Sequence, residues 1–185
     1  MLMEAERRSA KQLQTLISED LDVASADLQI LAEVLQSSGL LDDSLEVQNA
    51  ARKRVEHLFL ELVKGRQVYD QIRFLNDVGM EKIRVNLDGK GAVAVGADRL
   101  QDKSKRYYFK ESLDQPPGGV FVSPFDLNKE FGEIERPLKP MLRIGRPIFD
   151  SNGNKRGVVL INYLGGDLLA KISRNSRANS LLPLL

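Results

Sequence analysis

The sequence contains no cysteine, which excludes disulfides, thiolate metal sites and cysteine nucleophiles. Its single histidine, His57, is expected to face solvent or the edge of a helix, and one histidine cannot build a histidine-based metal cluster. No run approaches the roughly 18 apolar positions that a membrane-spanning helix needs. A serine-centred nucleophile elbow, a P-loop and a Gly-x-Gly-x-x-Gly phosphate-binding turn are also missing. We therefore expect no catalytic residues, no metal and no cofactor.

The charges are nearly balanced, with 27 basic and 26 acidic residues among 185. Nucleic-acid binding usually requires a concentrated basic face, so we expect no nucleic-acid partner. The hydrophobic fraction of 42% is ordinary for a soluble globular chain. The length allows either one domain with a sizeable core or a small domain with a helical arm.

Residues 1–66 favour helix and are predicted to form an arm of two helices with a break near 37–43. Apolar residues recur at intervals of three and four up to Gln36, and Gly39 is a plausible left-handed cap. A helix of about 33 residues would be about 50 Å long, which is more than a small domain can cover. We therefore expect its N-terminal turns to project and to pair in a parallel homodimer.

Residues 67–172 are predicted to form a compact module, followed by a tail at 173–185. Apolar residues alternate on both sides of the turn at Asn76–Gly79, which predicts a β-hairpin. The predicted fold class is α+β, with the long helices packed on a five-stranded antiparallel sheet. The expected elements are a hairpin at 69–86, a short helix at 106–113, strands at 120–123, 141–149 and 157–164, and a terminal helix at 167–172.

Four segments carry a resemblance to a known family. They read YDQIRFLNDVGMEKIRVN, RYYFKES, GVFVSPFDLN and RPIFDSNGNKRGVVLINYLGGDLL. In this order and spacing they resemble the Cache family, the extracytoplasmic PAS-like sensor domains of bacterial histidine kinases, chemoreceptors and diguanylate cyclases. The match covers about Gln67 to Leu169. The chain looks like the membrane-distal module of a two-module sensor or a single-module relative.

The resemblance implies a function. The chain would be the periplasmic or extracellular signal-input domain of a bacterial membrane receptor, most readily a sensor histidine kinase of a two-component system. It would bind a small organic molecule, such as a carboxylate, and pass the signal through its helices to the membrane. The catalytic output domain would lie outside this chain.

The resemblance also points to a ligand site. In amino-acid-sensing members, an Arg-x-Trp-Tyr run supplies an arginine for the ligand carboxylate, and a later aspartate holds the ammonium. Arg106 occupies the arginine position and Tyr108 the tryptophan position, while Phe109 and Asn162 replace the tyrosine and the aspartate. Because asparagine cannot neutralise an ammonium, an α-amino acid ligand is disfavoured, and a carboxylate or another small anion is left open.

Four further residues complete the candidate ligand-binding set: Phe121, Ser123, Asp126 and Arg143. For Asp126, stabilising the turn after the strand is the simpler role. Arg143 and Arg146 lie three residues apart, so on a regular strand they face opposite sides and one can point inward.

Arg73 and Arg84 lie on the opening hairpin. We expect them to make cross-strand pairs with Asp70, Asp77 or Glu81.

A rival interpretation from another class is a protein-interaction or dimerisation module that uses the same scaffold without a small ligand. A sensor requires a closed pocket with converging polar groups. The rival predicts a filled core and an exposed apolar patch. A hydrolase would need a catalytic constellation that the sequence does not show.

Overall fold

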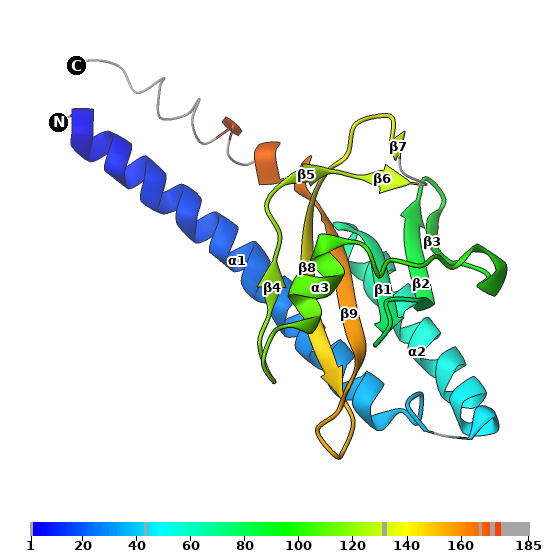
Figure 1. The fold of residues 1–185 in the computed structure, drawn as a ribbon. Coiled ribbons are helices and arrows are strands. Elements are labelled where there is room, and N and C mark those ends of the chain that lie inside the picture. Colours follow the sequence, from blue (N-terminus) through cyan, green and yellow to red (C-terminus); the bar gives the residue numbers. More distant parts are fainter. Residues whose placement is uncertain (1, 43, 131–132, 167, 171–172, 175–185) are drawn as a thin grey trace.

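The computed structural model describes residues 2–42, 44–130, 133–166, 168–170 and 173–174. Two long helices precede an antiparallel sheet, as predicted (Figure 1). The helices are α1 (Leu2–Ser37), α2 (Leu45–Arg66) and α3 (Tyr107–Leu113), with a 3-10 turn at Ala97–Arg99. The strands are β1 (Tyr69–Asn76), β2 (Glu81–Asp88), β3 (Gly91–Ala94), β4 (Phe121–Val122), β5 (Asp126–Leu127), β6 (Lys129–Glu130), β7 (Glu133–Ile134), β8 (Pro140–Phe149) and β9 (Lys155–Leu164).

The main sheet has the order β3-β2-β1-β9-β8-β4, and β5 also pairs with β8. The five predicted strands are all present, and β3 and β5 extend the sheet to seven strands. The first and last long strands are neighbours, because Ile72 of β1 pairs with Ile161 of β9. The first long strand, β1, and the last, β9, therefore pair with each other in the middle of the sheet.

The two long helices cover one face of the sheet, and the short helix α3 lies on the other (Figure 1). Alternation along each strand sends apolar side chains such as Ile72 and Phe74 toward the long helices, where they meet Leu31 of α1 and Phe59 of α2. A smaller apolar cluster joins Phe109 of α3 to the opposite face. Most of the core thus lies under α1 and α2, and the α3 face carries the polar residues.

A buried polar contact fixes α1 against the start of the sheet. Arg66, at the end of α2, donates two hydrogen bonds of 2.7 Å to the carboxylate of Asp27 in α1. The hydroxyl of Tyr69, the first residue of β1, donates to the same carboxylate at 2.5 Å. Burial and this hydrogen bond raise the pKa of Tyr69 well above its ordinary value. Asp27 therefore ties α1 to both α2 and β1.

The N-terminal half of α1 extends away from the sheet (Figure 1), as the helix length predicted. Described side chains there, such as Arg7, Lys11 and Glu19, are exposed. His57 is also exposed, on α2, as expected. The predicted terminal helix at 167–172 lies partly outside the described residues.

Candidate functional site

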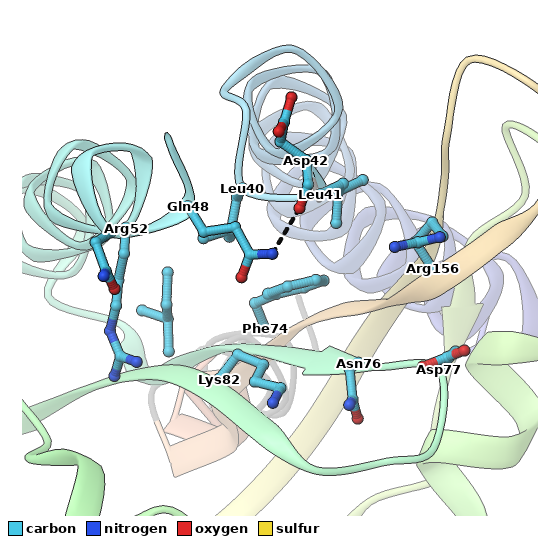
Figure 2. A pocket seen from close by; sticks show the side chains of 12 residues that line it. Leu40, Leu41, Asp42, Gln48, Arg52, Phe74, Asn76, Asp77, Lys82 and Arg156 are labelled. Atoms are coloured by element: carbon cyan, nitrogen blue, oxygen red, sulfur yellow. Dashed lines mark hydrogen bonds between the residues drawn. The ribbon is translucent and has the colours of Figure 1, made fainter. Parts of the chain in front are cut away.

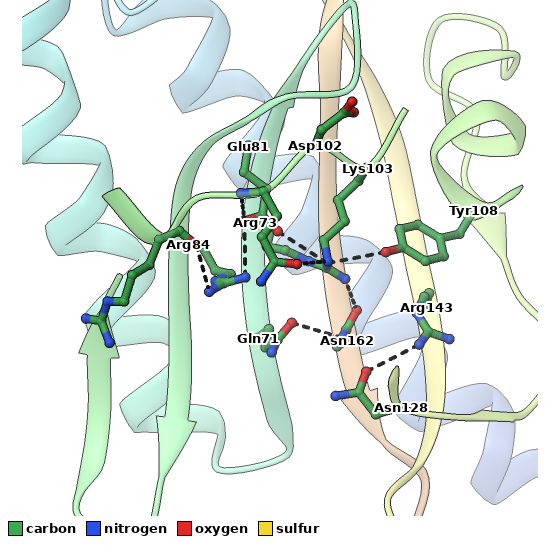
Figure 3. A network of polar contacts seen from close by, with 12 residues as sticks. Gln71, Arg73, Glu81, Arg84, Asp102, Lys103, Tyr108, Asn128, Arg143 and Asn162 are labelled. Atoms are coloured by element: carbon green, nitrogen blue, oxygen red, sulfur yellow. Dashed lines mark hydrogen bonds and ion pairs between the residues drawn. The ribbon is translucent and has the colours of Figure 1, made fainter. Parts of the chain in front are cut away.

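A row of buried polar side chains crosses the face of the sheet that α3 covers. The pairing register places Gln71 of β1 opposite Asn162 of β9, and Asn162 opposite Arg143 of β8. Arg73 follows two residues after Gln71 and therefore faces the same side. All four side chains are buried, with Asn162 fully inaccessible. The amide of Asn162 accepts from Arg73 at 2.6 Å and donates to Gln71 at 3.2 Å (Figure 3).

Two buried arginines lie directly opposite each other across β1 and β2. Arg73 pairs with Arg84 in the strand register, an arrangement that would repel without a neutralising group. Glu81 supplies that group, because its carboxylate lies 3.5 Å from Arg73 and 3.2 Å from Arg84 (Figure 3). It also accepts a hydrogen bond from the backbone amide of Gln101. The expected pairing with Glu81 is thus confirmed, whereas Asp70 contacts Lys139 instead.

Helix α3 places Tyr108 over the arginines. The guanidinium carbons of Arg143 and Arg73 lie 4.9 and 5.4 Å from the centroid of its ring, within cation–π range. Arg73 also donates to the Tyr108 hydroxyl at 3.4 Å. Burial alone would raise the pKa of Tyr108, but the charges of Arg73, Lys103 and Arg143 and this hydrogen bond hold it below its ordinary value. The interior beneath α3 is therefore electropositive.

The approach of α3 to the sheet depends on Gly145 in β8. A Cβ atom at this position would lie 2.1 Å from the hydroxyl oxygen of Ser112 in α3 and 2.6 Å from a methyl group of Leu160. Any larger residue would push the helix outward. Gly145 therefore sets how closely α3 approaches the sheet, and with it the depth of the site.

The outer side of the site is built by the segment after β4. Arg143 forms an ion pair with Asp126, and Tyr107 of α3 donates to the same carboxylate at 2.8 Å. Asn128 accepts from Arg143 at 3.4 Å. Ser123 accepts from the backbone amide of Arg143 at 2.9 Å, which secures the segment to β8. Asp126 therefore contacts the network directly, beyond any role in its own turn.

The structure brings most of the predicted ligand residues together. Tyr108, Asp126, Arg143 and Asn162 belong to one connected network. Phe121 lies beside it, with its ring 6.5 Å from that of Tyr107. Their contact with a ligand, and that of Ser123, stays a prediction.

Arg106 stands apart from this network. It precedes the first turn of α3, is half-buried, and makes no side-chain hydrogen bond or ion pair with the residues that the structure describes. Its guanidinium is therefore not committed to a protein partner within that part of the chain. Its role as the carboxylate-binding residue also stays a prediction.

Several members of the network were not included in the candidate ligand-binding set, namely Gln71, Glu81, Arg84, Lys103 and Asn128. The sequence shows only that Gln71 and Arg73 alternate with apolar neighbours. It gave no sign that α3 and the segment before it cover that face, so surface pairing was the simpler expectation.

Three separate pockets, each open to solvent, lie elsewhere on the described residues. One of about 360 Å³ lies between the α1–α2 turn and the β1–β2 hairpin, where Arg52, Lys82 and Arg156 surround Phe74 (Figure 2). A second, of about 690 Å³, lies between α2 and the β2–β3 turn, and a third, of about 310 Å³, between α1 and β8. Residues of the polar network line none of these three. Within the network the polar side chains instead contact one another.

Two further kinds of feature bear on function, a metal site and a membrane-spanning helix. Across the described ranges, no group of three or more His, Asp or Glu residues is placed to hold a metal ion. Among the helices described, none combines the length and the apolar character that crossing a bilayer requires.

The comparisons with known proteins that give a match all identify bacterial sensor domains. The family model "Bacterial histidine kinase, sensor domain" matches residues 4–183. A domain of a sensory box/GGDEF family protein from Vibrio parahaemolyticus is 26% identical, with a TM-score of 0.68 over 91% of this chain. The extracellular domain of the histidine kinase vpHK1S-Z8 is also 26% identical, with a TM-score of 0.66 over 93% of this chain. No curated protein matches significantly.

More distant structures share the fold. The ligand-binding domain of the Campylobacter jejuni chemoreceptor Tlp3 in complex with L-valine has a TM-score of 0.69 over 93% of this chain, at 11% identity. The chain spans 64% of the length of the Vibrio parahaemolyticus protein and of the Tlp3 domain, and 62% of vpHK1S-Z8. The resemblance to Cache-type sensors is thereby confirmed.

Proposed function

Because the chain belongs to the family of bacterial histidine kinase sensor domains, we propose that it is the ligand-binding input domain of a bacterial transmembrane receptor. In this proposal, a small organic molecule binds between the sheet and α3. The domain faces the periplasm or the cell exterior, and the receptor is a histidine kinase of a two-component system. The sensor domain itself carries out no catalysis.

The convergence of buried polar groups under α3 is the observation that supports this proposal. Arg73, Arg143 and Asn162 come from three strands and meet beneath Tyr108. Polar groups buried together in this way cost free energy unless they satisfy one another or a ligand. A scaffold that served only to expose a surface would have no need to assemble them.

The network connects to the helices through the start of β1. Gln71 hydrogen-bonds Asn162, while Tyr69, two residues earlier, hydrogen-bonds Asp27 of α1 on the opposite face. The register between β1 and β9 shifts at this point. A ligand that changes the position of Gln71 would therefore act on α1 through three residues of one strand, and this short path favours α1 as the output element.

We propose that residues 1–66 form the signalling arm and residues 67–172 the sensor module, the membrane-distal of two. The projecting half of α1 would pair with that of a second copy. Analytical ultracentrifugation that showed only monomer at high protein concentration would contradict this dimer.

Two observations favour the rival function, an interaction module without a small ligand. The polar side chains under α3 contact one another and line none of the three pockets. The segment from β4 to β8 exposes four large apolar side chains, Val122, Phe125, Ile134 and Leu138, each at least 42% accessible. Exposed apolar side chains gathered in one segment can mark a protein-binding surface. Under this alternative, substitutions at these four positions would abolish partner binding, and Tyr108→Ala would not.

Mass spectrometry of small molecules released from the denatured, purified chain tests the sensor proposal. We expect a co-purified compound, or thermal stabilisation by a compound from a metabolite panel, that Arg106→Ala abolishes. Arg52→Ala is the matched control, because Arg52 lines the cavity at the α1–α2 turn. Loss in the Arg52 variant alone would move the ligand to that cavity. The absence of any bound compound and of any stabilisation would favour the interaction module.

A further inference from the structure

The pocket of about 360 Å³ at the α1–α2 turn has an apolar base (Figure 2). Phe74 of β1 and Ile83 of β2 line it and lie directly opposite each other in the strand register. Both side chains are at most 2% exposed and belong to the core under the long helices, on the face of the sheet opposite to α3. Leu40 and Leu41 of the α1–α2 turn line the pocket as well. The pocket therefore offers an apolar surface to the body of a bound molecule.

A β-bulge in β2 brings Lys82 to this pocket. The register between β1 and β2 shifts after Phe74, which pairs with Ile83, because the next residue, Leu75, pairs with Glu81. Lys82 is left as the extra residue of the bulge. Regular alternation would turn Lys82 and Ile83 to opposite faces of the sheet, yet both line this pocket. The bulge thus redirects a cationic side chain.

A second bulge, in β9, does the same for Arg156. The register between β8 and β9 shifts after Ile148, which pairs with Gly157, and the next paired residue of β9 is Lys155. Arg156 is therefore the extra residue, and it lines the same pocket. Gly157 permits this backbone, because its φ is +146° and a Cβ atom there would lie 2.0 Å from the backbone oxygen of Leu75. Two separate bulges thus each deliver a cation to one pocket.

The cations of the pocket are available to a ligand. Arg52 of α2 is the third of them. Arg52 and Arg156 are half-buried, and Lys82 is exposed. Within the part of the chain that the structure describes, the side chains of Arg52 and Lys82 make no hydrogen bond or ion pair. Arg156 has a long contact of 3.9 Å with Asp150.

Two carboxylates also line the pocket, those of Asp42 and Asp77. The carboxylate of Asp42 accepts a hydrogen bond of 2.8 Å from the backbone amide of Ser44, and Figure 2 shows it pointing away from Phe74. Asp77 is exposed in the β1–β2 turn. Since three cations face two peripheral carboxylates, the balance of charge favours an anion over a cation.

We propose that this pocket is a second ligand site, which binds a small organic carboxylate with an apolar body. The body would lie against Phe74 and Ile83, and the carboxylate would interact with the cations that the two bulges place around them. The pocket includes residues of the α1–α2 turn and of the β1–β2 hairpin, so the ligand would join these two segments. This site lies on the opposite face of the sheet from the site under α3, and the inference goes beyond the proposed function.

A nuclear magnetic resonance titration of the ¹⁵N-labelled, 185-residue chain tests the proposal. The probes are 3-phenylpropionate, the neutral 3-phenylpropanol and the cationic 3-phenylpropylamine, which share an apolar body and differ in charge. We expect the acid to shift the amide signals of Leu41, Ile83 and Arg156, with a Kd of about 1 mM or below. The alcohol and the amine should bind about tenfold or more weakly, because they cannot pair with the cations.

The double substitution Lys82→Gln and Arg156→Gln tests the bulge residues. We expect it to weaken binding of 3-phenylpropionate about tenfold or more, since it removes both charges and keeps side chains of similar length. Lys105→Gln with Lys110→Gln is the matched control. Both lysines are exposed, neither lines any of the three pockets, and the change in net charge is the same. The control should leave the affinity unchanged.

The outcomes are separate from those of the proposed function, which concerns the other face of the sheet and Arg106→Ala. Shifts confined to residues under α3, or equal binding of the acid and the amine, would overturn this inference and leave the sensor function standing. Full affinity in the Lys82 and Arg156 double variant would overturn it as well. If that variant does not fold, the comparison of the three probes on the unmodified chain still decides.

Discussion

Replacing Glu81 by glutamine should strongly destabilise the domain. Glu81 is only 1% exposed and is the carboxylate between Arg73 and Arg84, which face each other across β1 and β2. Removing one partner of a buried ion pair usually costs about 3–5 kcal/mol, because the remaining charge stays buried without compensation. Here the substitution would leave the guanidiniums of Arg73 and Arg84 buried without a carboxylate between them.

The geometry of the contacts places the expected cost toward the lower end of this range. The carboxylate lies 3.5 and 3.2 Å from the two guanidiniums, and neither contact is an aligned hydrogen bond. The glutamine amide oxygen can still accept from the backbone amide of Gln101, as Glu81 does. We therefore expect Glu81→Gln to lower the free energy of unfolding by about 3 kcal/mol.

Urea unfolding followed by far-ultraviolet circular dichroism measures this effect. With a denaturant slope of about 2–3 kcal/mol per molar urea, the unfolding midpoint should fall by about 1 M. Glu61→Gln on the exposed side of α2 is the matched control and should change the free energy of unfolding by no more than about 0.5 kcal/mol. A change of less than about 1 kcal/mol in the Glu81 variant would show that the arginines do not depend on Glu81, and would refute the argument from buried charge.

Three further predictions concern α3 and the start of β1. In a pH titration followed by phenolate absorbance, one tyrosine should ionise below the ordinary pKa, because cations around Tyr108 stabilise its phenolate, and Tyr108→Phe should remove this early phase. Tyr69→Phe should lower the free energy of unfolding by about 2 kcal/mol in urea, because it removes the buried hydrogen bond to Asp27. Gly145→Ala should weaken ligand binding in titration calorimetry, because its methyl group would overlap Ser112 and displace α3.

Each of these predictions has a result that would contradict it. A phase that persists in Tyr108→Phe would assign the early ionisation to another tyrosine. Unchanged stability in Tyr69→Phe would mean that Arg66 alone satisfies Asp27. Full ligand affinity in Gly145→Ala would show that the position of α3 does not control the site, whereas its exposed counterpart Gly166→Ala should have no effect in any case.

The sequence was sufficient for the helices α1, α2 and α3 and for the long strands, because each depends on local chemistry. Apolar residues at threes and fours specify α1 and α2, and alternation around Asn76–Gly79 specifies the β1–β2 hairpin. The turn between β8 and β9, residues 150–154, could also be identified from its own residues. The two short strands β3 and β5 were not predicted as such, since four and two residues carry too little periodicity to identify a strand.

The candidate site was predictable only in part. The resemblance singled out Tyr108 and Asn162, and strand alternation left Arg143 as one of two arginines that can point inward. These three do meet under α3. The resemblance also assigned Arg106 to the carboxylate-binding position, and the structure leaves that residue outside the polar network. Arg73 and Glu81, which hold the centre of the network, carry no local pattern that distinguishes a buried pair from a solvated one.

The sequence by itself thus determined which residues form helices and strands, and which side chains share a face of each strand. Only the tertiary structure decided that the polar face of β1 and β2 is covered. It did so by pairing β1 with β9 and by setting α3 against Gly145. The physical reason is that side-chain direction follows from backbone period, whereas burial depends on segments far apart in the chain. Residues 73, 81, 143 and 162 become one electropositive site only when the sheet closes.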